Sequence, residues 1–180
     1  MGTSIRNEPS MQPKQYTVMT VCTGNICRSP MAQIVLADFF ARQGIGTDQV
    51  LVDSSGVSDE EYGNPIDRRA QKVLLERGYS LPEHHFAHRI THEEAVQSDL
   101  LLPMTLAHRR SLLHLLPADK RPAVHMYRSF DPEVAARASG DDSVLDLADP
   151  WYGGPEEFET AIDQIESAAP YIVDWVTRQL

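Results

Sequence analysis

Cysteine is scarce in this chain, and long apolar runs are missing from it. The 180 residues include only two cysteines, Cys22 and Cys27, which are too few and too close together for a disulfide scaffold. No segment approaches the roughly 18 apolar residues of a membrane-spanning helix, and the first fifteen residues contain no apolar core of a signal peptide. We therefore expect a cytoplasmic protein without a membrane partner, with secretion by a route that needs no signal peptide left open.

Basic residues are also in short supply. Lys and Arg together number 16 against 26 Asp and Glu, which gives a formal net charge of −10. A chain this acidic lacks the electrostatic footprint of a nucleic-acid binder, so we expect no nucleic-acid partner. If the protein binds an anion, it must build a local positive site against its own field.

The remaining composition is that of a globular domain. Hydrophobic residues make up 42% of the chain, which is enough to bury a core, and the length fits one compact domain. Residues 1–14 contain two prolines and no periodicity, so we expect a flexible tail there and a single domain over residues 15–180.

Strand-like and helix-like segments alternate along the domain. Short β-rich or apolar runs predict strands at 16–22, 50–52, 99–102 and 123–127. Helical spacing predicts helices at 31–43, 67–77 and 106–115 and from residue 156 onward, with Pro170 kinking or dividing the last one. This order predicts an α/β fold, a doubly wound parallel sheet of four strands flanked by helices on both faces. The long acidic segment 129–155 looks irregular, which in a compact domain is often functional.

The segment that joins the first strand to the first helix is the most informative. Ligands of doubly wound sheets bind beyond the carboxyl ends of the strands, where Cys22 lies. A loop of this length can surround one tetrahedral oxyanion with backbone N–H groups, because Gly24 and Asn25 tolerate left-handed backbone. Arg28 can donate two parallel hydrogen bonds to such an anion. The predicted phosphate-binding residues are Thr23, Gly24, Asn25, Ile26, Cys27, Arg28 and Ser29.

The same positive environment would stabilise a thiolate on Cys22. A thiolate that faces a bound phosphate is a nucleophile aimed at phosphorus, and the Ser29 hydroxyl could donate a hydrogen bond to it. A cysteine six residues before an arginine also occurs by chance, and buried cysteines are usually small hydrophobes. The preceding strand and the helix start expected at Ser29-Pro30, with Ser29 as N-cap, favour the catalytic interpretation.

Phosphoester cleavage also needs an acid for the leaving oxygen. The acidic segment contains two Asp-Pro steps, at Asp131 and at Asp149. Asp149 is followed by Trp151 and Tyr152, two aromatic residues that could flank an aromatic leaving group. This favours Asp149, although most Asp-Pro steps are simple turns and the residues alone leave both candidates open.

Four histidines cluster in the sequence without forming a recognisable metal motif. His84, His85, His88 and His92 have no cysteine and no regular ligand spacing among them. No glycine-rich nucleotide-binding loop occurs either. We therefore expect neither a metal nor an organic cofactor.

Several segments together resemble the low-molecular-weight protein tyrosine phosphatases. Residues 22–30 resemble the signature loop of that family, residues 149–152 its late general-acid loop, and residues 53–56 the turn after its second strand. The resemblance extends from Tyr16 to the C-terminus, and the Arg-Ser-Phe-Asp-Pro run at 128–132 resembles bacterial, particularly actinobacterial, members.

The resemblance implies an activity and three catalytic roles. It implies hydrolysis of phosphotyrosine in a protein substrate through a phosphocysteine intermediate, with inorganic phosphate as product. Cys22 would be the nucleophile, Arg28 the phosphate clamp and Asp149 the general acid and base. The resemblance also leads us to expect a monomer or a weak dimer.

Supporting roles follow from the same resemblance. Ser29 would stabilise the thiolate as leaving group, and Asn25 would hold the loop in a left-handed kink, bonded to Ser54 and to His85. Cys27 matches a second cysteine that can form a reversible disulfide with the nucleophile under peroxide, and simple packing is the alternative for it.

Some positions bear on substrate choice. Relatives that dephosphorylate arginine tend to carry threonine at position 26, so Ile26 favours phosphotyrosine over the phosphoarginine alternative. The cleft would be lined by Trp151 and Tyr152, and many members add an aromatic residue near position 60. Here Glu60 and Glu61 are acidic, which disfavours acidic phosphopeptides, and Tyr62 is a candidate replacement for the aromatic residue.

Two other functions remain alternatives. Arsenate reductases share this fold and loop, but their chemistry needs further cysteines or an external thiol. A non-catalytic phosphotyrosine-binding or redox-sensing module would not need the intact set of Cys22, Arg28 and Asp149.

Overall fold

A three-stranded parallel sheet forms the centre of the protein. The computed structural model describes residues 13–180, so the predicted tail lies outside the described residues except for positions 13 and 14. Strand β1 (Tyr16–Cys22) lies between β2 (Val50–Gly56) and β3 (Leu100–Pro103), and the order is β2-β1-β3. The helices are α1 (Arg28–Arg42), α2 (Arg68–Glu76), α3 (His92–Gln97), α4 (Leu106–Leu115), α5 (Pro132–Arg137) and α6 (Pro155–Thr177).

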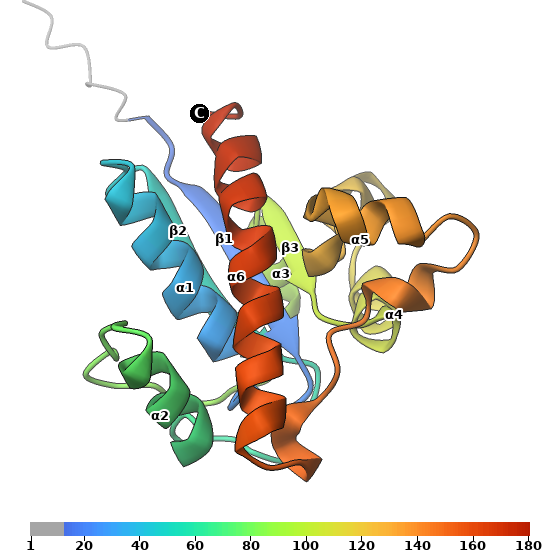
Figure 1. The fold of residues 1–180 in the computed structure, drawn as a ribbon. Coiled ribbons are helices and arrows are strands. Elements are labelled where there is room, and N and C mark those ends of the chain that lie inside the picture. The colour runs from blue at the N-terminus through green and yellow to red at the C-terminus, as the bar shows by residue number, and fades with distance from the viewer. Residues whose placement is uncertain (1–12) are drawn as a thin grey trace, which may run out of the picture.

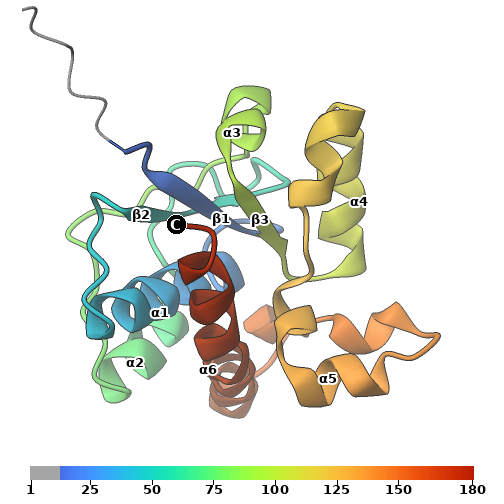
Figure 2. The same ribbon diagram turned by 90° about the horizontal axis from the view of Figure 1, so that it is seen from above.

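Helices cover both faces of the sheet, as predicted. Figures 1 and 2 show α1 and α6 side by side on one face, with α2 next to them, and α3 and α4 on the other. Side chains of β1 alternate between the two layers: Val18 packs in the cluster that includes α1 and α6, whereas Met19 and Val21 pack in the cluster that includes α3 and α4. This alternation buries both faces of the central strand, and the parallel pairing of β1 with β2 and β3 places their carboxyl ends at one edge.

The prediction of a fourth strand at 123–127 is wrong. Val124 forms a single parallel bridge to Leu101, and the His125 N–H donates to the Leu101 carbonyl at 3.0 Å. Short 3₁₀ helices at Ala118–Ala123 and Tyr127–Phe130 lie before and after this bridge. Too few extended residues therefore remain between these helices for a ladder.

The acidic segment is more ordered than its sequence suggests. It contains α5 and the 3₁₀ turns Asp142–Leu145 and Pro150–Tyr152, so the expectation of an irregular stretch is wrong. The six-residue helix α3 has no long apolar period and was not predicted from the sequence, although Thr91 and Glu94 form a capping box at its start.

Of the two outcomes predicted for Pro170, a kink or a division of the helix, the division is wrong, because helix α6 continues through this residue. Pro170 lies on the exposed side of α6, while Ala169, Ile172 and Val173 on the opposite side are buried in the core. Packing of that apolar side offsets the missing hydrogen bond of the proline.

We predict that Pro170→Ala stabilises the protein. Alanine restores a helical N–H donor and removes the ring clash, and in a helix interior it is favoured over proline by up to about 3 kcal/mol. Denaturant unfolding followed by circular dichroism should show a higher midpoint with an unchanged slope. An unchanged or lower midpoint would mean that α6 carries no proline penalty.

Candidate active site

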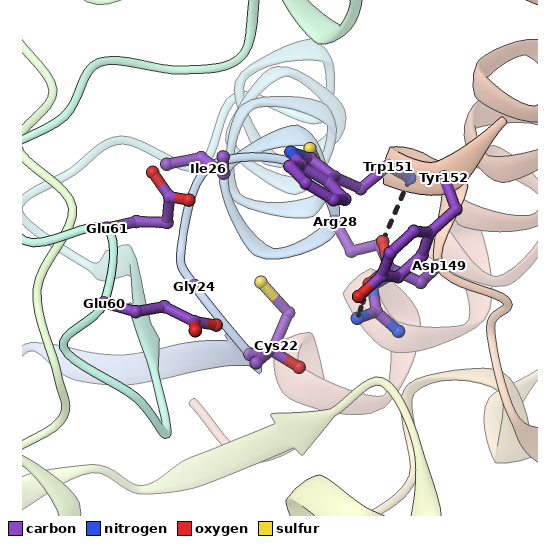
Figure 3. Close-up of a pocket in the computed structure, with 11 residues that line it drawn as sticks. Cys22, Gly24, Ile26, Arg28, Glu60, Glu61, Asp149, Trp151 and Tyr152 are labelled. Atoms are coloured by element: carbon purple, nitrogen blue, oxygen red, sulfur yellow. Dashed lines mark hydrogen bonds and ion pairs between the residues drawn. The ribbon is translucent and has the colours of Figure 1, made fainter. Parts of the chain in front are cut away.

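The predicted loop surrounds a cavity at the carboxyl edge of the sheet. Cys22 is the last residue of β1, and α1 begins at Arg28, so the 22–28 loop joins the central strand to a helix N-terminus. The cavity has a volume of about 240 Å³, and Figure 3 shows the Cys22 sulfur beside it. Its lining consists of Cys22, Thr23, Gly24, Ile26, Cys27, Arg28, Glu60, Glu61, Asp149, Trp151 and Tyr152.

Asn25 turns this loop and ties it to its surroundings. Its φ of 60° is the only positive value at a non-glycine residue in the described part of the chain. The buried Asn25 side-chain amide donates to the hydroxyls of Ser29 and Ser54, each at 3.0 Å, and its oxygen accepts from the His88 N–H at 3.2 Å. The His85 Nε2 lies 2.7 Å from the Asn25 carbonyl oxygen. Both contacts that the resemblance implied for Asn25, to Ser54 and to His85, are therefore present.

The directions of these bonds orient the Ser29 hydroxyl toward the sulfur. Ser29 Oγ lies 3.0 Å from Cys22 Sγ, and both side chains are buried. Because Ser29 Oγ already accepts a hydrogen bond from the Asn25 amide, its own O–H is free to donate to the sulfur. A hydrogen bond donated to the sulfur favours the thiolate form.

Helix α1 begins at Arg28, before the predicted range of 31–43 and before the start expected at Ser29-Pro30. Arg28 and Ser29 are helical, and the Met31 N–H donates to the Cys27 carbonyl at 3.1 Å. The prediction of Ser29 as N-cap is therefore wrong, because its hydroxyl is used by Asn25 and Cys22 instead. The first turn of α1 contains no acidic residue, so the positive end of the helix dipole beside the cavity is not offset from within the helix.

Arg28 is buried beside the cavity, and its guanidinium is held from two sides. It donates to the Leu147 carbonyl at 3.0 Å and forms an ion pair with Asp149 at 3.2 Å. Its side chain is only 4% exposed, and its Nε has no hydrogen-bond partner among the described residues. An oxyanion in the cavity would supply the acceptor that this buried donor needs.

Asp149 reaches the cavity from the C-terminal part of the chain. Its carboxylate accepts from the Trp151 N–H at 3.1 Å and so caps the turn Pro150–Tyr152. Arg69 anchors this turn by donating to the carbonyls of Trp151 and Gly153, at 3.0 and 3.1 Å. Arg69 is itself held by Asp67 and lies over the Phe158 ring at 4.6 Å.

The structure separates the two aspartate candidates that the sequence left open. Asp131 caps α5 by accepting from the Glu133 N–H at 3.0 Å, and its other oxygen accepts from the Ser167 hydroxyl at 2.6 Å. It does not line the cavity, whereas Asp149 does. Asp131 therefore has a structural role.

The remaining predicted site residues divide into two groups. Trp151 and Tyr152 line the cavity, but Tyr62 does not, and this residue is 76% exposed. The expectation that Tyr62 contributes to the cleft is therefore not met, because Glu60 and Glu61 occupy that side. Cys27 is buried, and burial followed by the nearby Asp67 raises the pKa of its thiol far above the usual range, so it stays a neutral thiol.

Both cysteines are free thiols. The histidines that cluster in the sequence make separate contacts in the structure. His85 contacts the Asn25 carbonyl, whereas His88 pairs with Glu94 at 2.8 Å. Over residues 13–180 no group of three His, Cys, Asp or Glu side chains is placed to hold a metal ion. In the same range no helix is long and apolar enough to cross a membrane.

One buried histidine at the site was missed by the sequence analysis. His108 of α4 is 3% exposed, and its Nε2 lies 2.8 Å from the Thr23 hydroxyl. Burial, followed by the charge of Arg28, lowers the pKa of His108 to about 3, so the ring is neutral at physiological pH. The available signal was topological: α4 starts directly after β3, at the same edge of the sheet as Cys22.

Fold and cavity together define a doubly wound α/β protein with a thiol, an arginine and a carboxylate around one oxyanion site. Residues 17–180 match the family described as low molecular weight phosphotyrosine protein phosphatase. The chain belongs to this family.

Individual relatives agree with that assignment. The chain is 40% identical to low molecular weight protein-tyrosine phosphatase A of Mycobacterium tuberculosis, over 91% of this chain and 93% of that protein. It is 37% identical to a low molecular weight protein-tyrosine-phosphatase of Streptomyces coelicolor, over 92% of this chain and 96% of that protein. A crystal structure of a low molecular weight phosphotyrosine phosphatase from Vibrio cholerae superposes with a TM-score of 0.77 at 27% identity. The superposition covers 91% of this chain and 98% of that one. The resemblance to bacterial and actinobacterial members is thereby confirmed.

We predict that Asn25→Ala destabilises the protein by at least about 2 kcal/mol, because buried hydrogen bonds are lost and alanine is strained in the left-handed region. Asn25→Gly is the matched control: it loses the same side chain but relieves the backbone strain, so it should unfold at a higher denaturant concentration than the alanine variant. Equal midpoints for the two variants would show that the positive φ costs nothing here.

We also predict a distinct pH dependence for His108→Gln. The folded pKa of His108 is about 3, below the unfolded value of about 6.5, so the unfolded state binds the proton first as the pH falls. The contribution of neutral His108 to the free energy of unfolding is complete above about pH 6.5 and is lost as the pH falls. The loss is about 2 kcal/mol between pH 7 and pH 5. Between about pH 7 and pH 5, the free energy of unfolding of His108→Gln should therefore fall by about 2 kcal/mol less than that of the wild-type protein. Identical pH profiles would contradict the neutral, buried state.

Proposed function

We propose that this chain is a protein tyrosine phosphatase in which Cys22, Arg28 and Asp149 carry the reaction. The observation that carries the proposal is their placement: a sulfur at the end of the central strand, a buried arginine with an unpaired Nε, and a carboxylate line one cavity. The family to which the chain belongs supports the substrate class.

In the first step the Cys22 thiolate attacks phosphorus in line with the tyrosyl oxygen. The sulfur–phosphorus bond forms as the phosphorus–oxygen bond breaks, and Asp149 in its acid form donates its proton to the leaving tyrosyl oxygen. Arg28 and the N–H groups of the 22–28 loop stabilise the charge on the equatorial phosphoryl oxygens.

In the second step water hydrolyses the phosphocysteine. Asp149, now a carboxylate, takes a proton from the attacking water, and the sulfur–phosphorus bond breaks to release inorganic phosphate. The Ser29 hydroxyl, 3.0 Å from the sulfur, stabilises the departing thiolate. The neutral Cys27 thiol does not compete as nucleophile, because its raised pKa keeps its proton in place.

The aromatic residues at the cavity favour an aryl phosphate. The rings of Trp151 and Tyr152 lie 4.9 Å apart in an edge-to-face arrangement, next to the carboxylate that would protonate the leaving group. Such rings can pack against a phosphotyrosine ring while the phosphate reaches the sulfur. We propose a phosphotyrosine-containing protein as substrate and a monomer or weak dimer as the active form. Because the nucleophile must stay reduced, we also propose a cytoplasmic setting.

We predict that Asp149→Ala lowers kcat most for poor leaving groups. A general acid contributes roughly 10²–10⁴-fold where the leaving oxygen needs a proton, as for phosphotyrosine or phenyl phosphate. The loss should be far smaller for dinitrophenyl phosphate, whose leaving oxygen needs little protonation. Equal losses for both would count against an acid role and leave only a positioning role.

Cys22→Ser is the control for the nucleophile. It should abolish turnover of every aryl phosphate while the circular dichroism spectrum stays that of the folded protein. Residual turnover close to wild type would refute the assignment. Phosphoarginine and arsenate with a thiol reductant, assayed in parallel, test the two alternative activities of the same loop.

A further inference from the structure

The cavity has two chemically different sides. Figure 3 shows Asp149, Trp151 and Tyr152 on one side and Glu60 and Glu61 on the other. The two glutamates follow β2, and we call them the acidic wall. Nothing in the proposed chemistry requires carboxylates there, on the side of the cavity opposite Asp149.

One residue of the acidic wall, Glu61, lies against the 22–28 loop. The Glu61 carboxylate accepts from the Asn64 side-chain amide at 2.7 Å. The Glu61 Cγ lies 2.9 Å from the position that a Cβ on residue 24 would occupy, so Gly24 allows the glutamate stem to lie against the loop. The Ser58 N–H also donates to the Thr23 carbonyl at 3.1 Å, which joins the start of this segment to the loop. Glu61 is therefore held against the loop that begins at Cys22, and the exposed Glu60 precedes it in the chain.

The charge of the acidic wall is not offset by the protein. Neither Glu60 nor Glu61 takes part in an ion pair within residues 13–180. Arg28 lines the cavity but pairs with Asp149 and is assigned to the phosphoryl oxygens, and the nearby Arg69 pairs with Asp67. Two carboxylates beside a site for a phosphate dianion repel that dianion, and a substrate cation between them would relieve the repulsion.

We propose that Glu60 and Glu61 select phosphotyrosine sequences that carry lysine or arginine within about two positions of the phosphotyrosine. This proposal rests on the proposed function. A cationic side chain at that distance can reach the wall while the phosphate sits in the 22–28 loop and Arg28 takes the phosphoryl oxygens. Acidic flanks, in contrast, meet the same carboxylates and are disfavoured.

The test compares three phosphotyrosine peptides that differ only in their flanking residues, which are lysine, alanine or glutamate. With wild-type protein at low salt, kcat/KM should be about fivefold higher for the lysine peptide than for the alanine peptide, as two exposed ion pairs would give. It should be lowest for the glutamate peptide, and the spread should shrink at high salt. Equal values for the three peptides, or a preference for glutamate, would overturn the proposal.

Charge-neutral variants locate the effect. The double variant Glu60→Gln/Glu61→Gln keeps the side-chain shape and should bring the three peptides to nearly the same kcat/KM. The matched control Glu76→Gln/Glu93→Gln removes two charges from exposed positions on α2 and α3 that do not line the cavity, and it should keep the wild-type preference. A preference that survives in the first variant would overturn the role of Glu60 and Glu61. A preference that disappears in the second would assign it to the overall negative charge instead.

Turnover of para-nitrophenyl phosphate separates this proposal from the proposed function. That substrate has no flanking residues, so it measures phosphatase activity in each variant independently of peptide recognition. No turnover by the wild-type protein would contradict the proposed function itself. Turnover combined with equal kcat/KM for the three peptides would refute only the role of the acidic wall.

Discussion

The left-handed conformation of Asn25 is the constraint on which the site depends. A φ of 60° turns the 22–28 loop back around the cavity, and the side chain of the same residue ties that loop to α1 through Ser29 and to β2 through Ser54. Ser54 in turn donates to the Gln33 side chain at 2.7 Å, so the bonds run from the loop through β2 back to α1. Since Asn25, Ser29 and Ser54 are buried, breaking one of their contacts leaves an unpaired polar atom, and the loop is held in a single shape.

The sequence predicts the layers of this fold better than the extent of its sheet. Strand β1 and helix α4 occupy their expected ranges, and helices cover both faces as the alternation of elements indicates. The predicted fourth strand does not form, because the segment around Val124 pairs with β3 through one bridge only, despite its β-rich composition. Helix α6 passes through Pro170 because burial of its apolar side outweighs the local penalty. In both cases tertiary contacts, invisible in a local pattern, decide the outcome.

The site is predictable where one short segment contains the chemistry. Cys22, Arg28 and their loop come from adjacent residues between a strand and a helix, so the chain order alone brings them together. The choice between Asp131 and Asp149 depends on contacts to α6 and to Arg28, far away in the sequence, and only the fold resolves it. His108 was missed for the same reason, because its partner Thr23 lies 85 positions away.

An acidic protein that binds an anion must concentrate its positive potential. Here the cavity combines the N-terminus of a fifteen-residue helix without acidic first-turn residues and one buried guanidinium. The start of α6, in contrast, has Glu156 and Glu157 in its first turn, which offset the dipole there. Burial lets Arg28 act through a medium of low dielectric, so one cation outweighs more distant carboxylates that water screens. The acidic wall lines the side of the cavity opposite Asp149, and in our proposal its charge discriminates among the residues that flank the phosphotyrosine.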